Sequence, residues 1–263
     1  MALVIAIANQ KNGEGKTTTT YNLAAALSRV GKMVLMIDID PQYSLTERST
    51  FVPDAPEFNG MSSCSLFSKC TDPLDCCFTI DAMKSTTLFI VPSNQDLELL
   101  ASHRFTPNID IGAFCSNIEK LKPYFDYIFL DCPSSLNDLL TASLVAADGV
   151  IIPVKPERLS FAGMHMILQT IDSIRTKPKG QTGNPDLKVF GLIATMFQAK
   201  NNEHREYKNM LAAKSNLLGV ISHSSFLAKE TGSSLPIVVE HPFSASAKEY
   251  ERIALKCAIM DAV

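Results

Sequence analysis

A glycine-rich segment near the start of the sequence has the residue types of a phosphate-binding loop. Residues 9–18 read NQKNGEGKTT and lie between an apolar, strand-like segment and a helical one. Gly13 and Gly15 let backbone N–H groups turn inward around phosphate oxygens. A helix that begins near Thr17 adds the positive end of its dipole. Lys16 is placed to reach the β- and γ-phosphates of a nucleotide, and the Thr17 hydroxyl is placed to ligate Mg²⁺.

Two apolar segments carry aspartates at their C-terminal ends. Asp38 and Asp40 are two residues apart, so in an extended chain their side chains face the same side. Such a pair suits a Mg²⁺ shell and the orientation of an attacking water. Residues 127–131 read YIFLD, in which four apolar residues deliver Asp131 to a strand end. This is the Walker B arrangement, where the carboxylate holds a Mg²⁺-bound water.

The elements that must position these residues alternate between strands and helices. Short runs rich in Ile, Val, Leu and Phe predict strands that are buried on both faces of a parallel sheet. These runs are residues 3–8, 33–38, 88–91, 127–131, 149–154 and 189–195. Helices are predicted over residues 17–30, 95–103, 111–121, 136–147, 161–175, 203–216 and 246–260. The expected fold class is therefore α/β, a doubly wound, mostly parallel sheet with helices on both faces and ligands at the carboxyl ends of its strands.

Composition limits the class of protein. Hydrophobic residues make up 46% and charged residues 19%, so a sizeable core is expected, and no apolar run is long enough to span a bilayer. The opening apolar residues lack a basic region, so we interpret them as a strand and not as a signal peptide. Seven cysteines, an odd number, indicate a reduced, cytoplasmic protein. Cys64, Cys70, Cys76 and Cys77 lack the paired spacing of a zinc site.

The glycine loop resembles that of the deviant Walker ATPases, the ParA/MinD family, which reads K-G-G-x-G-K-[ST]. Gln10 stands where the usual P-loop has glycine, and Lys11 stands five residues before Lys16. The resemblance implies a P-loop NTPase fold, ATP and Mg²⁺ as cofactors, and a homodimer in which Lys11 reaches the partner subunit's nucleotide. The residues expected at the nucleotide are Lys11, Asn12, Gly13, Glu14, Gly15, Lys16, Thr17, Thr18 and Pro156.

Two residues of the loop depart from the family pattern. Asn12 stands where the family has glycine. Asparagine tolerates a left-handed backbone better than most residues, so we expect it to preserve the loop. Glu14 places a negative charge beside a phosphate site, at a position that is usually small or apolar. Two interpretations stay open: Glu14 slows binding or hydrolysis, or it points outward without effect.

The aspartates also lie in segments that resemble family motifs. Residues 38–42 read DIDPQ, like the D-x-D-P-Q of ParA proteins, which implies that Asp40 positions or activates the attacking water and Asp38 supports the metal shell. Residues 131–134 read DCPS and carry the Walker B role over to Asp131. The resemblance thus implies that Lys11, Lys16 and Asp40 are catalytic. It implies that Thr17, Asp38 and Asp131 hold the metal.

A further segment resembles a motif that lies near the nucleotide and the dimer interface in relatives. Residues 153–157 read PVKPE, like the family's P-V-x-P-E, and this places Pro156 at the nucleotide. Lys155 occupies the variable position. It is interpreted as a solvent-facing lysine in preference to one that touches a nucleotide or a partner subunit.

Many ParA relatives bind DNA without sequence preference, through arginines in the segment that corresponds to residues 221–229. That segment contains no arginine here. The net charge of −3 and the pI of about 6.0 do not indicate a nucleic-acid-binding protein either. The basic residues that remain as candidates for phosphate contact are Lys200, Arg205, Lys208 and Lys214 on one helical stretch, with Lys229, Lys248, Arg252 and Lys256. Exposed helices also carry such residues as ordinary solvated surface.

The resemblance implies an ATP-dependent dimerising switch that binds nucleoid DNA and segregates or positions a cargo: a plasmid, a chromosome origin or a cytosolic assembly. Hydrolysis would be slow and stimulated by a ParB-like or cargo-adaptor partner, and the protein would be cytoplasmic and nucleoid-associated. We interpret residues 1–263 as one such domain with a variable insertion at about 41–86. One alternative is a MinD-like membrane-associated ATPase, although residues 246–260 lack a basic polar face. Another is a metabolic ATP-dependent enzyme on the same fold.

Overall fold

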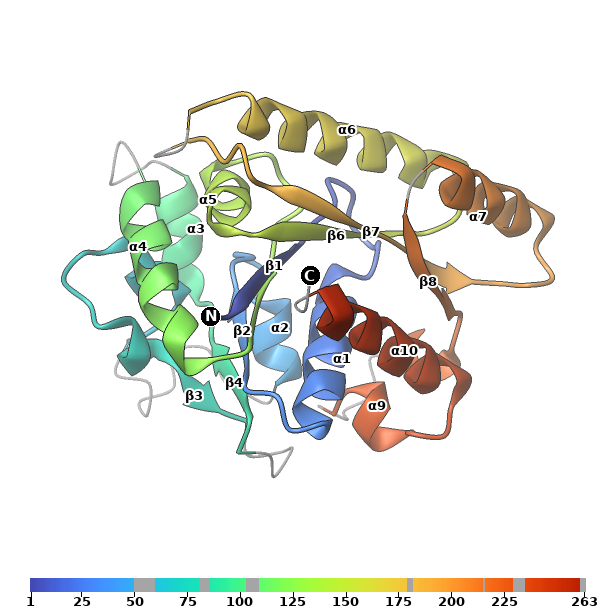
Figure 1. Ribbon diagram of the computed structural model, residues 1–263, viewed down its shortest axis with the longest axis horizontal. Coiled ribbons are helices and arrows are strands. Elements are labelled where there is room, and N and C mark those ends of the chain that lie inside the picture. The colour runs from blue at the N-terminus through green and yellow to red at the C-terminus, as the bar shows by residue number, and fades with distance from the viewer. Residues whose placement is uncertain are drawn as a thin grey trace.

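One mixed sheet organises the protein (Figure 1). The computed structural model describes residues 1–49, 60–80, 86–102, 109–178, 182–214, 216–228 and 235–260. Within these residues eight strands lie in the order β3-β4-β2-β5-β1-β6-β7-β8, and every pairing is parallel except that of β3 with β4. The strands are β1 (Leu3–Ile7), β2 (Val34–Asp38), β3 (Phe78–Thr79), β4 (Leu88–Val91), β5 (Tyr127–Asp131), β6 (Gly149–Val154), β7 (Lys188–Phe197) and β8 (Leu217–Ser222).

The middle of the sheet is apolar because both of its faces are covered. Every residue of β2, β5 and β6 is buried, as expected for parallel strands between two layers of helices. The register aligns Asp38 of β2 with Asp131 of β5, and Ile7 of β1 with the same aspartate. Three neighbouring strands therefore end together at the edge where the phosphate loop leaves β1.

Helices pack against both faces (Figure 1). One apolar core joins the sheet to α1 (Lys16–Arg29), α2 (Ser44–Arg48), α9 (Ile237–Glu240) and α10 (Ala245–Met260). The core on the opposite face involves α3 (Gln95–Ala101), α4 (Ile111–Leu121), α5 (Asp138–Ala146), α6 (Arg158–Arg175) and α7 (Asn202–Lys214). A short helix, α8 (Ser225–Ala228), follows β8. The predicted fold class, a doubly wound and mostly parallel α/β sheet, is confirmed.

The segment from residue 41 to residue 86 contains regular elements where it is described. Besides α2 and β3, it forms 3-10 turns at Ser63–Phe67 and Pro73–Cys76, which contact α4. Residues 50–59 and 81–85 lie outside the described residues. Of the described part, α2 borders the phosphate loop, whereas the two 3-10 turns extend the core beneath α4.

Candidate functional site

The phosphate loop joins β1 to α1 through two left-handed glycines. Gly13 has φ 77° and Gly15 has φ 83°, and Gly15 is the residue that precedes the first turn of α1. Both conformations favour glycine because they crowd a Cβ atom. Asn12 is not among the described residues with positive φ, so the loop forms here without a left-handed backbone at that position. The loop turns at Gly13 and Gly15 instead.

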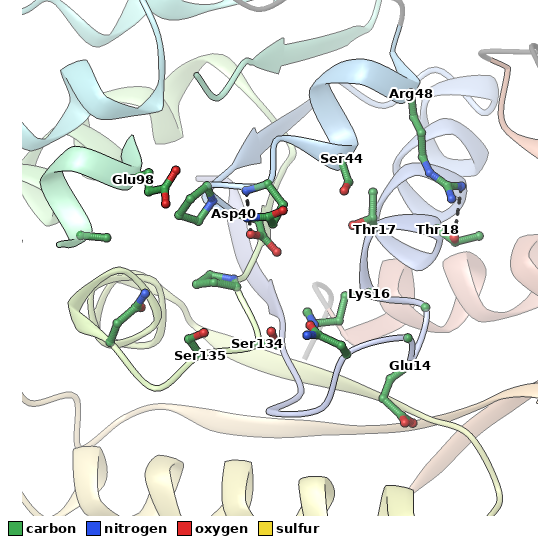
Figure 2. A pocket seen from close by; sticks show the side chains of 18 of the residues that line it. Glu14, Lys16, Thr17, Thr18, Asp40, Ser44, Arg48, Glu98, Ser134 and Ser135 are labelled. Carbon is green, nitrogen blue, oxygen red and sulfur yellow. Dashed lines mark hydrogen bonds between the residues drawn. The ribbon is translucent and has the colours of Figure 1, made fainter. Parts of the chain in front are cut away.

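A cavity of about 890 Å³ opens over this loop. Asn12 through Thr18 and Asp40 line it, as predicted. Figure 2 shows Lys16, Thr17 and Asp40 around the same hollow. The Lys16 side chain is largely buried at 8% exposure. Backbone donors at the start of a helix and a buried ammonium together form an anion-binding site.

Four of the predicted site residues lie elsewhere. Among the described residues, Lys11, Asp38, Asp131 and Pro156 do not line the cavity. Asp38 and Asp131 are buried beneath it at 0% and 1% exposure. Pro156 is buried in the segment between β6 and α6.

Asp131 has an unsatisfied oxygen below the loop. Its Oδ1 accepts a hydrogen bond from the Thr20 hydroxyl at 3.1 Å, while its buried Oδ2 has no hydrogen-bond partner among the described residues. Burial raises the pKa of this carboxyl, and the charge of Asp40 adds to that effect while the Lys16 ammonium opposes it. A buried carboxylate with a free oxygen beside the first turn of α1 fits a Mg²⁺-bound water, so the residues present suit the expected cation.

Both carboxylate oxygens of Asp38 accept hydrogen bonds from neighbouring residues. Its Oδ2 accepts hydrogen bonds from the backbone N–H and the hydroxyl of Thr46, at 2.9 and 2.7 Å, and its Oδ1 accepts one from the backbone N–H of Asp40. Burial and the charge of Asp131 raise the pKa of Asp38. These bonds orient the turn after β2 and hold Asp40 at the cavity wall, so the contacts of Asp38 are those of a residue that shapes the turn.

Glu14 lines the cavity, but its carboxylate points away from Lys16 and Thr17 (Figure 2). Its side chain is 1% exposed. Its Oε1 accepts a hydrogen bond from Ser160 at 2.8 Å and its Oε2 accepts one from the Lys155 backbone N–H at 2.6 Å. Glu14 therefore does not point outward, because its carboxylate is buried against α6 and the end of β6.

Lys11 and Lys155 lie beside the same carboxylates. Lys11 Nζ is 2.9 Å from Glu14 Oε1 and 3.1 Å from Glu157 Oε1. Lys155 Nζ is 2.8 Å from Glu157 Oε2 and the side chain is 33% exposed. Lys155 is therefore an ion-paired lysine at the surface, and the expectation of a lysine that simply faces solvent is correct for its exposure but misses its partner.

Sequence reasoning missed several residues of the cavity wall. Arg48 on α2 lines the cavity and approaches the Thr18 hydroxyl at 3.4 Å. Ser134 and Ser135, which follow β5, also line it. The D-x-P-S resemblance contained the signal for the serines, whereas nothing in the pattern indicated that α2 forms and carries Arg48 to the cavity.

A second, smaller cavity of about 80 Å³ adjoins the first. The two share Gly15, Thr18, Met196 and Leu227. Met196 has a left-handed backbone (φ 52°), which is uncommon outside glycine, and this bends the end of β7 over the loop. The smaller cavity therefore extends the phosphate site toward apolar side chains.

Four of the predicted basic residues, Lys200, Arg205, Lys208 and Lys214, lie on or just before α7, and Lys248, Arg252 and Lys256 lie on α10. Lys200 and Arg205 are exposed, and Lys208 Nζ lies 5.7 Å from the centre of the Phe197 ring. The side chains of Lys214 and Lys229 lie outside the described residues. Lys256 donates a hydrogen bond to the carbonyl of Leu218 at 2.6 Å.

The described part of the chain contains neither a cluster of metal-ligating side chains nor a membrane-spanning helix. In the described part of the chain, no three His, Cys, Asp or Glu side chains are grouped to hold a metal ion, the cysteine-rich segment included. Within those same residues, no helix is both long and apolar enough to cross a membrane.

Comparison with known proteins identifies the family. The profile of a family described as "AAA domain" matches residues 2–189. The sporulation initiation inhibitor protein Soj of Bacillus subtilis is 32% identical over 98% of this chain and 99% of its own length. The chromosome-partitioning ATPase Soj of Thermus thermophilus is 29% identical, over 95% and 93%.

A solved structure with bound nucleotide is also similar. Cobyrinic acid a,c-diamide synthase from Mycobacterium smegmatis, crystallised with ADP and magnesium, superposes with a TM-score of 0.77 at 27% identity, over 98% of this chain and 94% of that one. The same family is indicated by the phosphate loop, by the aspartates that end β2 and β5, and by the similarity to Soj over nearly the whole chain. The chain belongs to the ParA/MinD family of P-loop ATPases.

Proposed function

We propose that the protein is an ATP-dependent dimerising switch that positions or segregates a cargo. The observation that carries the proposal is the position of Lys11. This lysine sits on the phosphate loop, yet among the described residues it does not line the cavity over that loop. A phosphate-loop lysine that does not face its own cavity is available to a nucleotide held by a second copy of the chain. The similarity to Soj proteins over nearly the whole length supports the same function.

ATP and Mg²⁺ are the proposed cofactors. The triphosphate would lie over residues 13–18, with Lys16 against its β- and γ-phosphates. Thr17 and Asp131 would hold the cation, whose charge neutralises phosphate oxygens. Asp38 would act through the turn that carries Asp40. The smaller cavity beside Met196 is a suitable place for the apolar face of the base, because it continues directly from the phosphate site.

Asp40 would orient the attacking water. It lines the cavity from the side opposite the loop and its Oδ1 accepts a hydrogen bond from the Gln42 backbone N–H at 3.0 Å, which fixes the carboxylate. A fixed carboxylate within reach of a water is the equipment of a general base or a water-positioning group. We propose no second base, and intrinsic turnover would therefore be slow until a partner completes the site.

We propose that the ATP-bound dimer binds DNA without sequence preference while it positions its cargo. A ParB-like or cargo-adaptor protein would be the activator. The DNA contacts would be made by Lys200, Arg205, Lys208 and Lys214, which a dimer presents twice. Fluorescence anisotropy on random duplex tests this proposal, with ATP compared with ADP. ATP-dependent binding is expected. No binding at low salt, or binding that ignores the nucleotide, would contradict the DNA part of the proposal, since a switch must distinguish its two states.

A metabolic enzyme is the second candidate, and the similarity to the cobyrinic acid a,c-diamide synthase favours it. Such an enzyme couples ATP to the chemistry of a small substrate, so its turnover would be stimulated by that substrate. ATP turnover that is stimulated by a small carboxylic acid and is indifferent to DNA and to protein partners would favour this candidate. The membrane-associated candidate has less support, because the apolar face of α10 is already packed against α1 and β8.

A further inference from the structure

Glu14 is an acidic residue inside the phosphate loop. A negative charge does not help a loop to bind phosphate, so the residue needs another explanation. Three neighbours hold its buried carboxylate: the ammonium of Lys11, the hydroxyl of Ser160 and the backbone N–H of Lys155. Its own backbone carbonyl accepts a hydrogen bond from the Thr195 hydroxyl at 3.0 Å. The residue therefore ties the loop to the end of β6, to α6 and to β7 at once.

The charges around Lys11 form a neutral cluster of two lysines and two glutamates. Lys11, Lys155 and Glu157 are 29%, 33% and 26% exposed, whereas Glu14 is 1% exposed. These three partly exposed side chains can turn toward solvent, but the buried Glu14 cannot. In this cluster Glu14 is the fixed anion and Lys11 is a cation that can exchange partners.

The stem of Lys11 is also confined. A Cβ atom added to Gly163 of α6 would lie 2.8 Å from both the Cβ of Lys11 and the Oδ1 of Asn9. That oxygen in turn accepts a hydrogen bond from the Lys11 backbone N–H at 3.0 Å. Because α6 approaches this closely, the backbone at Lys11 is fixed and the freedom of the residue lies in the end of its side chain.

We propose that Glu14 is a positioning residue that retains the Lys11 ammonium within its own subunit, so that dimerisation must draw Lys11 away from it. This inference rests on the proposed function, in which Lys11 serves the partner subunit's nucleotide. The competition has a definite physical basis: when Lys11 leaves, the Glu14 carboxylate keeps its bonds to Ser160 and to the Lys155 N–H but loses its counter-ion. Uncompensated buried charge is costly, and the phosphate that attracts Lys11 must overcome that cost.

The protonation of Lys11 is consistent with its retention by Glu14. Burial acts to lower the pKa of Lys11, but the hydrogen bonds and charges of Glu14 and Glu157 outweigh it and raise the pKa above 10.5. Lys11 is therefore held as a cation, and its neutral, nucleophilic form is scarce. Removal of the Glu14 charge should make that form more common.

The test uses Glu14→Gln, which preserves the shape of the side chain but removes the charge. The amide oxygen can still accept from the Lys155 backbone N–H, and the amide NH2 can donate to the Ser160 hydroxyl in place of the second acceptor oxygen. The dissociation constant of the Mg²⁺·ATP dimer is measured by sedimentation for the wild type and the variant. Dimerisation is expected to tighten about tenfold in Glu14→Gln, the effect of one lost charge-assisted bond. An unchanged or weaker dimer in the folded variant would overturn the proposal, since it would mean that Glu14 does not oppose dimerisation.

A second readout works without dimerisation. The rate at which an amine-reactive reagent labels Lys11 in nucleotide-free protein is measured by mass spectrometry, with Lys69, which is 77% exposed, as internal reference. Lys11 labelling is expected to rise several-fold in Glu14→Gln and also in Glu14→Ala, which covers the case where one variant fails to fold. Unchanged labelling in both would overturn retention. A wild-type protein that forms no ATP-dependent dimer would refute the proposed function itself, while the labelling result would still decide whether Glu14 holds Lys11.

Discussion

Asp38 and Asp131 are register partners at the ends of neighbouring parallel strands, and both carboxyl groups are buried. Burial and their mutual repulsion raise the pKa of Asp38, and burial raises that of Asp131. It is therefore unfavourable for both carboxyl groups to be ionised in the nucleotide-free protein. A divalent cation at Asp131 would reduce that cost.

This arrangement predicts a pH dependence of the nucleotide-free protein. Because the folded-state pKa values lie above 3.8, the ordinary value for aspartate, the stability from the neutral carboxyls is fully present below about pH 4 and is lost as the pH rises through the folded-state values. The free energy of unfolding of the wild type should fall between about pH 5 and about pH 8. Over that range, the Asp131→Asn variant should lose roughly 1–2 kcal/mol less stability than the wild type. Denaturant unfolding measures it. Parallel pH profiles for the two proteins would contradict the assignment.

Lys16→Ala should lose affinity for the nucleotide itself. The ammonium is buried beside the loop, and charge-assisted bonds to phosphate account for a large share of binding, so we expect ATP to bind roughly 10- to 100-fold more weakly. Isothermal titration with ATP and Mg²⁺ measures this, and Lys69→Ala serves as the matched control at a lysine that does not line the cavity. Equal affinities for Lys16→Ala and the control would remove Lys16 from the phosphate site.

Asp40→Ala should bind ATP normally but fail to turn it over. A carboxylate that orients the attacking water contributes on the order of 10²- to 10⁴-fold to the rate, whereas it makes no contact that holds the phosphates. Phosphate release and ATP binding are measured on the same preparations. Glu47→Gln, an exposed acidic residue of α2 that does not line the cavity, is the control. Normal hydrolysis by Asp40→Ala would show that another group positions the water.

The double variant Arg205→Ala, Lys208→Ala should weaken DNA binding evenly across sequences. Each phosphate contact releases counterions, so the log–log salt slope should become shallower by about 2, roughly one unit for each lost contact. The same loss of charge at Lys69 and Lys120 on other surfaces is the control. Anisotropy over a salt series with ATP gives both slopes. An unaltered slope in the α7 variant would mean that α7 is not the DNA surface.

The sequence allowed the sheet and the phosphate site to be predicted because both are encoded locally. The apolar runs that form β2 and β5 end in aspartates, and parallel strands place those ends together. β8 was not predicted, because its burial pattern at the sheet edge is irregular. The helix α2 is five residues long, too short for a periodic signal.

The direction of Glu14 could not be predicted for a different physical reason. Its partners Lys155 and Ser160 lie more than 140 residues away in the sequence, so only the folded approach of α6 to the loop decides whether the carboxylate faces solvent or the interior. The left-handed residue at Met196 is a similar case, because it lies within a register shift between β7 and β8 that only the folded sheet shows.

Lys11 is proposed to make dimerisation depend on ATP, and light scattering coupled to size exclusion is the sharpest test of that role. The measurement compares the wild type with Lys11→Ala, each with Mg²⁺·ATP, with ADP and without nucleotide. With ATP alone, the wild type is expected to have a mass near twice the 28.7 kDa of the chain. Lys11→Ala is expected to stay monomeric but still bind ATP, because Lys11 does not line its own cavity. A dimer that persists in Lys11→Ala, or one that forms equally without nucleotide, would contradict the claim.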